Sequence, residues 1–205
     1  MAAIKAVIWD VGGVLLRAED ETIKKALAER YQLTLRELYG LVFYGESAQK
    51  ATLGQISERQ HWANIGSKFH LDQQSLAAFE RDFWAGDALD TELISFIRAL
   101  KKDYKTGLLS NAWDGARKAL SDIYHCMDAF DYSVFSAEVG LAKPDPAIYM
   151  KLIDMMGVLP EESIFVDDLL ENISAANRLG IHGVQFLNTV QAKQEVTYLL
   201  TSSRC

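Results

Sequence analysis

Five short and mostly apolar runs recur along the chain, at Ile4–Trp9, Lys105–Leu109, Tyr132–Phe135, Ser163–Val166 and Gly183–Leu187. Each run is too short for a helix and continuous enough for a strand buried on both faces. Amphipathic helical patterns lie between them, at Thr91–Lys102, Asp145–Gly157 and Leu170–Leu179. Because strands alternate with helices, the pattern predicts a doubly wound α/β fold, in which helices cover both faces of a parallel sheet.

The segment from residue 17 to residue 87 breaks this alternation. It contains no convincing strand, and its helical patterns cover Glu21–Tyr31, Leu35–Tyr44, Ile56–Phe69 and Gln73–Trp84. Glu46, Gln49 and Lys50 fall in a polar linker between these patterns. We therefore expect two domains. Residues 1–16 and 88–205 form the α/β core, and residues 17–87 form a helical domain inserted after the first strand.

The charge of the chain narrows its range of partners. Lys and Arg total 21 against 28 Asp and Glu, which gives a formal net charge of −7. Such a surface repels phosphate backbones, so we expect no nucleic-acid partner, although a small anion needs only local positive charge. No apolar run approaches the ~20 residues that span a bilayer, so we also expect no membrane partner.

The cysteines bear on location. Cys126 and Cys205 are the only two in the chain, too few for a disulfide framework, and they favour a reducing, cytoplasmic compartment. The first strand-like run begins at Ile4, which leaves no room for a signal peptide. We expect a monomer or a homodimer.

Polar residues follow the ends of three predicted strands. Asp10 follows the first strand, Ser110 and Asn111 follow the second, and Asp167 and Asp168 follow a later one. In an open parallel sheet, ligands bind beyond the carboxyl ends of the strands. Carboxylates that converge there repel one another unless a cation neutralises them, and oxygen ligands suit Mg²⁺. The sequence therefore predicts a magnesium site at this edge of the sheet.

Lys143 and the turn after Asp10 would make the same edge a phosphate site. The Lys143 ammonium, in a loop that leads into a helix, can hold an anionic group there. Ser110, Asn111 and N–H groups of the turn, including that of Gly13, would donate hydrogen bonds to the substrate. Asp10 would then attack phosphorus in line and form an aspartyl phosphate, since phosphoryl transfer depends mainly on positioning and charge stabilisation.

Each of these residues also has a structural interpretation. Asp10 precedes two glycines and could be a turn residue, and Asp167 and Asp168 could cap the helix that follows them. Lys143 could be a solvated surface side chain. Asn172 could orient Asp168 or cap its own helix. The catalytic interpretation depends on their occurring together, because adjacent acids at a buried strand end are costly without a cationic partner.

Four segments, in order and over nearly the whole chain, resemble the motifs of the haloacid dehalogenase-like superfamily in its phosphatase branch. They are Val7–Val14 (VIWDVGGV), Gly107–Asn111 (GLLSN), Gly140–Tyr149 (GLAKPDPAIY) and Phe165–Asp168 (FVDD). The resemblance implies a magnesium-dependent phosphatase with a Rossmann-like core. It also implies that the helical insertion at 17–87 is a cap that closes over the site.

The resemblance implies a role for each motif residue. Asp10 would be the nucleophile, Ser110 would bind phosphate, Lys143 would steady the phosphoenzyme and Asp168 would bind Mg²⁺. Asp167 would be a second carboxylate near the metal or near Lys143.

Gly12 departs from the family pattern. Phosphatases of this family usually carry a second Asp at this position, which protonates the leaving group and later activates water. The Gly12 carbonyl can still coordinate Mg²⁺, but the general acid is missing, and such a group typically contributes about 10²–10⁴-fold in rate. Three explanations are open. The substrate has a good leaving group, as an anomeric or acyl phosphate does; or turnover is slow; or another side chain replaces the missing acid. By position, the candidates are Asp20, Glu46, His61 and Asp114.

We expect hydrolysis of small phosphomonoesters of the sugar-phosphate kind, with a small phosphorylated metabolite as the molecule bound. Two other functions stay open. A binding or regulatory protein with an eroded phosphatase site would explain Gly12. A 2-haloacid dehalogenase would use the same Asp10 without a metal, but the pair Asp167 and Asp168 argues against it.

Overall fold

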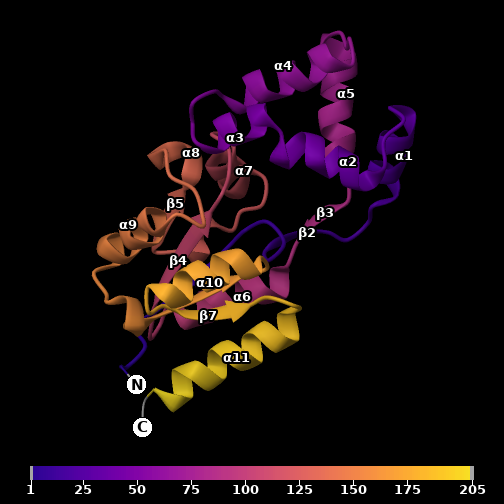
Figure 1. Ribbon diagram of the computed structural model, residues 1–205. Coiled ribbons are helices and arrows are strands. Elements are labelled where there is room, and N and C mark those ends of the chain that lie inside the picture. The colour runs from indigo at the N-terminus through magenta and orange to yellow at the C-terminus, as the bar shows by residue number, and fades with distance from the viewer. Residues whose placement is uncertain (1, 204–205) are drawn as a thin grey trace.

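A five-stranded parallel sheet forms the centre of the computed structural model, which describes residues 2–203 (Figure 1). Its strands stand in the order β5-β4-β1-β6-β7. They are β1 (Ala6–Trp9), β4 (Lys105–Ser110), β5 (Tyr132–Phe135), β6 (Ser163–Asp167) and β7 (His182–Gln185). The first strand is central and later strands add on both sides of it, so the predicted doubly wound α/β fold is confirmed.

Helices cover both faces of this sheet. They are α6 (Thr91–Leu100), α7 (Ala116–Asp122), α8 (Ser136–Val139), α9 (Pro146–Met156), α10 (Leu170–Arg178) and α11 (Thr189–Ser202), with 3₁₀ turns η2 (Met127–Ala129) and η3 (Pro160–Glu162). Val7 and Trp9 of β1 pack in one apolar cluster with α6 and α11, whereas Ala6 and Ile8 pack in a second cluster with α9 and α10. Alternate residues of a strand point to opposite faces, which explains why the buried runs are continuously apolar.

The register of the sheet brings the ends of β1 and β6 side by side. Trp9 is paired with Val166, and the Asp10 N–H donates to the Val166 carbonyl at 3.0 Å. One step further along, Asp10 therefore lies beside Asp167. On its other edge β1 pairs with β4, which ends at Ser110.

Residues 22–84 form a helical unit beyond the carboxyl end of the sheet (Figure 1). Its helices are α1 (Thr22–Arg30), α2 (Leu35–Tyr39), the π-helix η1 (Gly40–Tyr44), α3 (Glu46–Thr52), α4 (Glu58–Lys68) and α5 (Gln73–Trp84). Thr34 and Ser57 begin α2 and α4 with capping boxes. The unit has its own apolar cluster, and Trp113 from the loop after β4 is part of it.

A short antiparallel hairpin carries the chain into and out of the helical unit. It pairs β2 (Leu16–Ala18) with β3 (Asp87–Leu89). The predicted domain bounds at residues 17 and 87 fall within these two strands, and the division into domains stays a prediction. The hairpin strands were not predicted, because three residues of intermediate burial leave no periodic signal.

The expected linker around residues 46–50 is wrong, because these residues lie in α3. Only Ala48 and Ala51 are buried on this helix, while Glu46 and Lys50 form an ion pair of 2.7 Å one turn apart. A helix that buries two alanines shows no wide apolar stripe, so its pattern resembles a polar linker.

Neither a membrane-spanning helix nor a disulfide is found in residues 2–203. None of the described helices is both long enough and apolar enough to cross a bilayer. Cys126 is buried and forms no disulfide with the described residues, and Cys205 lies outside them.

Asp90 ties the hairpin to the core. Its Oδ1 accepts from the Leu93 N–H at 2.8 Å and so caps α6. Its Oδ2 accepts from Arg17 of β2 at 2.8 Å and from the hydroxyl of Thr189 at the start of α11. Asp90 is buried, so these three contacts join the hairpin to two core helices at one carboxylate.

We expect Asp90→Ala to lower the free energy of unfolding by about 2–4 kcal/mol, because it removes a helix cap and leaves Arg17 without its carboxylate. Asp72→Ala is a matched control. Asp72 caps α5 by accepting from the Ser75 N–H at 2.8 Å but is exposed, so its loss should cost about 1 kcal/mol. Urea unfolding followed by circular dichroism measures both, and equal losses would contradict the role of Asp90.

Candidate active site

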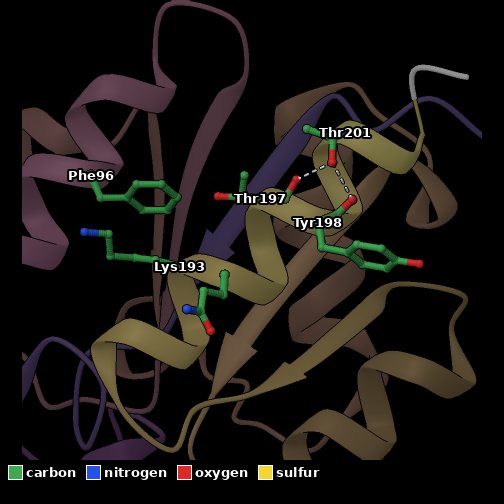
Figure 2. A pocket seen from close by; sticks show the side chains of 6 residues that line it. Phe96, Lys193, Thr197, Tyr198 and Thr201 are labelled. Carbon is green, nitrogen blue, oxygen red and sulfur yellow. Dashed lines mark hydrogen bonds between the residues drawn. The ribbon is translucent and has the colours of Figure 1, made fainter.

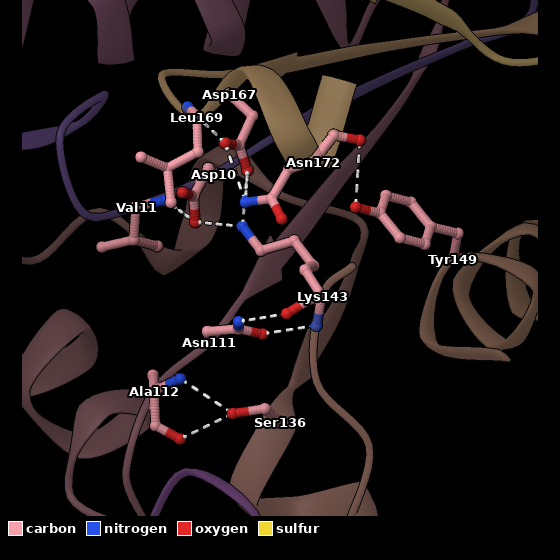
Figure 3. A network of polar contacts seen from close by, with 10 residues as sticks. All are labelled: Asp10, Val11, Asn111, Ala112, Ser136, Lys143, Tyr149, Asp167, Leu169 and Asn172. Atoms are coloured by element: carbon pink, nitrogen blue, oxygen red, sulfur yellow. Dashed lines mark hydrogen bonds and ion pairs between the residues drawn. The ribbon is translucent and has the colours of Figure 1, made fainter. Parts of the chain in front are cut away.

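One buried ammonium joins two buried carboxylates at the carboxyl ends of β1 and β6 (Figure 3). Lys143 Nζ lies 2.7 Å from Asp10 Oδ1 and 2.7 Å from Asp167 Oδ2. Asp10 follows β1, Asp167 ends β6, and Lys143 comes from the loop between α8 and α9. A buried charge is costly unless it is paired and hydrogen-bonded. The three groups therefore stabilise one another where water is excluded.

Asp167 is held by further donors from the segment that follows β6 (Figure 3). The Asn172 amide donates to both of its oxygens at 3.0 Å, and the Leu169 N–H donates to Oδ1 at 2.8 Å. We expected Asn172 to orient Asp168 or to cap its helix, and the structure corrects this. Asp167 is fully buried and Asp168 is not, so the buried amide of Asn172 meets Asp167.

The Asp10 carboxylate is held by one oxygen only. Oδ1 accepts from the Val11 N–H at 2.7 Å and faces Lys143. Within residues 2–203, Oδ2 has no hydrogen bond. This orientation leaves one carboxylate oxygen for an incoming group.

The acidic residues of this cluster fit a divalent cation. Asp10, Asp167 and Asp168 each offer a carboxylate oxygen, and these oxygens all lie within 4.8 Å of one another. Three carboxylates against the single Lys143 ammonium leave two negative charges in excess. Both that excess and the all-oxygen donor set suit Mg²⁺. A contribution from the Gly12 carbonyl stays a prediction.

Gly13 lets the turn after Asp10 approach Asp168 closely. Gly13 has a φ of +76°, a backbone conformation that disfavours any residue with a side chain. In addition, a Cβ at this position would lie only 2.3 Å from Asp168 Oδ2 and would clash with it. We expected the Gly13 N–H to bind substrate, but it donates to the Leu16 carbonyl at 3.0 Å. The tight turn itself uses this N–H, and substrate contact by Gly13 stays a prediction.

Asn111 fixes the loop that carries Lys143. Its amide nitrogen donates to the Lys143 carbonyl and its amide oxygen accepts from the Lys143 N–H, each at 2.8 Å. No local sequence pattern indicates this contact, because the two residues are 32 positions apart. Ser110 is buried at the end of β4. Direct substrate contact by Ser110 and Asn111 stays a prediction.

Burial and the excess of negative charge shift the proton affinities of the site. Burial raises the pKa of Asp10 to about 7 against the attraction of Lys143, and the Asp167 charge adds to the rise. Burial likewise raises the pKa of Asp168, again with help from Asp167. Burial alone would lower the pKa of Lys143, but Asp10 and Asp167 outweigh it and raise that pKa. The metal-free cluster therefore favours taking up protons, with which a divalent cation would compete.

The four candidate substitutes for the missing acid are bound elsewhere. Asp20 accepts from the Thr22 N–H at 2.8 Å, Glu46 pairs with Lys50, Asp114 accepts from the Glu58 N–H at 2.8 Å, and His61 Nδ1 meets Ser47 Oγ at 2.8 Å. Within residues 2–203, none of them has a hydrogen bond or an ion pair with Asp10 or Lys143.

Gly12 itself has room for a side chain. It is exposed, and a Cβ at this position would meet no atom within 4 Å. Sterically, an aspartate would fit where the family usually has one, so the fold does not impose the glycine.

A family model described as a haloacid dehalogenase-like hydrolase matches residues 4–180. The chain belongs to this family. The identification made from the four motifs is confirmed, and with it the prediction of a hydrolytic enzyme.

Two relatives align with almost the entire chain. The sesquiterpene phosphatase astK of Aspergillus oryzae is 27% identical over 197 residues, 96% of each chain. The D-ribitol-5-phosphate phosphatase of Bacteroides thetaiotaomicron is 27% identical over 213 residues, 97% of this chain and 100% of the relative.

Solved structures share the fold. A family member from Bacteroides thetaiotaomicron, in complex with magnesium and inorganic phosphate, has a TM-score of 0.74 at 22% identity, covering 89% of this chain and 94% of that one. An L-2-haloacid dehalogenase has a TM-score of 0.63 at 22% identity, covering 90% of this chain and 85% of that one. Both phosphate-binding and dehalogenase relatives thus share this architecture, and the architecture alone does not choose between them.

We expect Mg²⁺ to raise the melting temperature more at about pH 8 than at about pH 5. The folded-state pKa of Asp10 is raised to about 7. Without metal, the protonated Asp10 carboxyl therefore stabilises the folded state fully below the ordinary Asp pKa, and this stabilisation is lost as the pH rises through about 7. Mg²⁺ competes with these protons, and its benefit grows as they leave. Thermal unfolding with and without Mg²⁺ at both pH values measures the effect.

Two variants sharpen this measurement. Asp168→Asn should lose most of the Mg²⁺ benefit, whereas Asp145→Asn should keep it, because the exposed Asp145 only caps α9. A Mg²⁺ benefit that is equal at both pH values, or that survives in Asp168→Asn, would argue against the cluster as the metal site.

Proposed function

We propose that this protein is a Mg²⁺-dependent phosphatase that hydrolyses small phosphomonoesters through an aspartyl phosphate on Asp10. One observation carries the proposal: Lys143 binds Asp10 Oδ1 and Asp167, and Asp10 Oδ2 accepts no hydrogen bond from the described residues. Full-length relatives named as phosphatases support a phosphorylated substrate.

In the first step, Asp10 Oδ2 attacks phosphorus, and the bond from phosphorus to the alcohol oxygen breaks. Lys143 favours the ionised form of Asp10 and holds it in place, and Asn111 holds the Lys143 loop. Asp10, Asp167 and Asp168 would hold Mg²⁺, which supplies positive charge for the phosphoryl oxygens. The Ser110 hydroxyl donates a hydrogen bond to the same group.

In the second step, water attacks phosphorus of the aspartyl phosphate. The bond from phosphorus to Asp10 breaks, inorganic phosphate leaves, and the carboxylate is restored. The attacking water must lose a proton, and the leaving alcohol must gain one. With glycine at position 12, solvent supplies and accepts these protons, so substrates with good leaving groups react fastest.

The helical unit at residues 22–84 would act as the cap over this site, as the insertion at 17–87 predicts. It stands beyond the carboxyl end of the sheet (Figure 1), where it can exclude water and contact the alcohol part of a small phosphorylated metabolite. The two relatives differ in the alcohols that their names state, a sugar alcohol and a sesquiterpene. The sugar-like alcohol expected from the sequence therefore stays a prediction.

Asp10→Asn should lower phosphatase activity by at least about 10³-fold, because an amide oxygen is a far weaker nucleophile. The variant should fold, since it is isosteric and removes one charge from a crowded cluster. Phosphate release measures activity, and intact mass after rapid acid quench should find a phosphoryl adduct on the wild type alone. Asp168→Asn serves as a companion that lowers metal binding while keeping the nucleophile. Wild-type activity in Asp10→Asn would rule out covalent catalysis by this residue.

Gly12→Asp should raise kcat for alkyl phosphates by about 10²-fold and change kcat for acyl phosphates little, because only poor leaving groups need a proton donor. The open space at Gly12 permits the side chain. The ratio of the two rates in variant and wild type measures the effect. An unchanged ratio would contradict the missing acid as the limit on turnover.

The two alternatives give different results in the same assays. A regulatory binding protein would bind a phosphate ester tightly without hydrolysing it, and Gly12→Asp would restore the hydrolysis. Halide release from 2-haloacids in the presence of a chelator favours a dehalogenase.

A further inference from the structure

A group of aromatic rings lies where the helical unit meets the loop after Ser110. Trp113 of that loop is buried. Its ring centroid is 6.0 Å from that of Phe43 in η1 and 6.2 Å from that of Trp84 at the end of α5, and Phe43 and Trp84 are 6.0 Å apart. These distances are typical of attractive aromatic contacts.

The outer members of this group are open to solvent. Phe43 is 38% exposed, Trp84 is 39% exposed, and the neighbouring Tyr44 is 69% exposed. Single exposed apolar side chains are ordinary, but the rings of Phe43 and Trp84 are in contact, and Tyr44 is the residue after Phe43. Contiguous exposed apolar surface of this kind is typical of binding sites. We call Phe43, Tyr44 and Trp84 the aromatic surface.

The chain segments that carry these rings leave the sheet beside the nucleophile. Trp113 stands three residues after Ser110, the last residue of β4. Trp84 stands three residues before β3, whose partner β2 follows the turn after Asp10. The π-helix η1 runs between α2 and α3, on the side of the helical unit that faces the sheet (Figure 1). The aromatic surface therefore adjoins Trp113 in the loop that follows Ser110.

Two lysines of the helical unit are already paired with carboxylates. Lys24 is buried beside the Phe83 ring and binds Asp87, and Lys50 binds Glu46 at 2.7 Å. A polyhydroxylated alcohol would lose hydration against the rings and gain few hydrogen bonds. An apolar alcohol would bury its surface there at no such cost.

We propose that the aromatic surface binds the alcohol part of the substrate, and that this part is an aromatic ring system. The inference rests on the proposed phosphatase function and names its substrate class. An aryl phosphate meets both conditions of the site. Its ring packs on Phe43, Tyr44 and Trp84, and its phenolate leaves with little help from a general acid, which Gly12 does not provide.

Phenyl phosphate and 2-naphthyl phosphate test this without any variant. Their leaving groups have similar pKa values, so the chemical step is matched and only the apolar area differs. We expect kcat/KM to be about tenfold higher for 2-naphthyl phosphate, mainly through a lower KM. Equal kcat/KM values would overturn the inference while leaving the phosphatase function intact. Release of phosphate from neither ester, nor from acetyl phosphate, would overturn both.

Variants then assign the preference to the aromatic surface. Trp84→Ala and Tyr44→Ala should each reduce the naphthyl-to-phenyl ratio of kcat/KM by about three- to tenfold. The ratio compares two esters in the same variant, so a general loss of catalytic activity cancels from it. Tyr44 is largely exposed, so its variant tests the inference even where Trp84→Ala disturbs folding.

Tyr198→Ala is the matched control. Tyr198 is 67% exposed, close to the exposure of Tyr44. It lines a groove of about 420 Å³ between α6 and α11 (Figure 2). Tyr198 lies toward the carboxyl end of α11, where the hydroxyl of Ser203 accepts a hydrogen bond from the Ile4 N–H just before β1. That end lies opposite the nucleophile. A loss of preference as large in Tyr198→Ala as in Tyr44→Ala and Trp84→Ala would overturn the assignment.

Discussion

The ammonium of Lys143, buried between the carboxylates of Asp10 and Asp167, is the contact on which the rest of the site depends. Without it, two carboxylates at neighbouring strand ends would repel each other in a region that excludes water. With it, Asp10 is fixed by one oxygen while the other stays available. Negative charge is still in excess, because Asp168 adds a third carboxylate to a site with a single ammonium. A divalent cation would neutralise the remaining negative charge.

The sheet makes this meeting possible. β1 occupies the centre, so the segments that follow β4 and β6 flank Asp10 on both sides. Lys143 reaches the same place from a loop that Asn111 holds by two hydrogen bonds. Residues more than a hundred positions apart therefore converge without long excursions of the chain, as the parallel arrangement of strands allows.

The sequence was sufficient for the parts of the site that follow strand ends. Asp10, Asp167 and Asp168 could be predicted to converge because buried parallel strands place their carboxyl ends at one edge, and Lys143 followed from its motif. It could not reveal what depends on contacts between distant loops. The pairing of Asn111 with the Lys143 backbone, the preference of Asn172 for Asp167 and the use of the Gly13 N–H within its own turn have no local pattern. The helix α3 was not predicted for a different reason. It buries only two small side chains, so its sequence shows no wide apolar stripe.

Trp113 belongs to the loop after β4, yet its indole is part of the apolar interior of the helical unit. Asp114 beside it accepts the Glu58 N–H at the start of α4. The helical unit is consequently not a free-standing module. Helices grafted from a relative would have to accommodate the Trp113 indole and the Asp114 carboxylate of this loop.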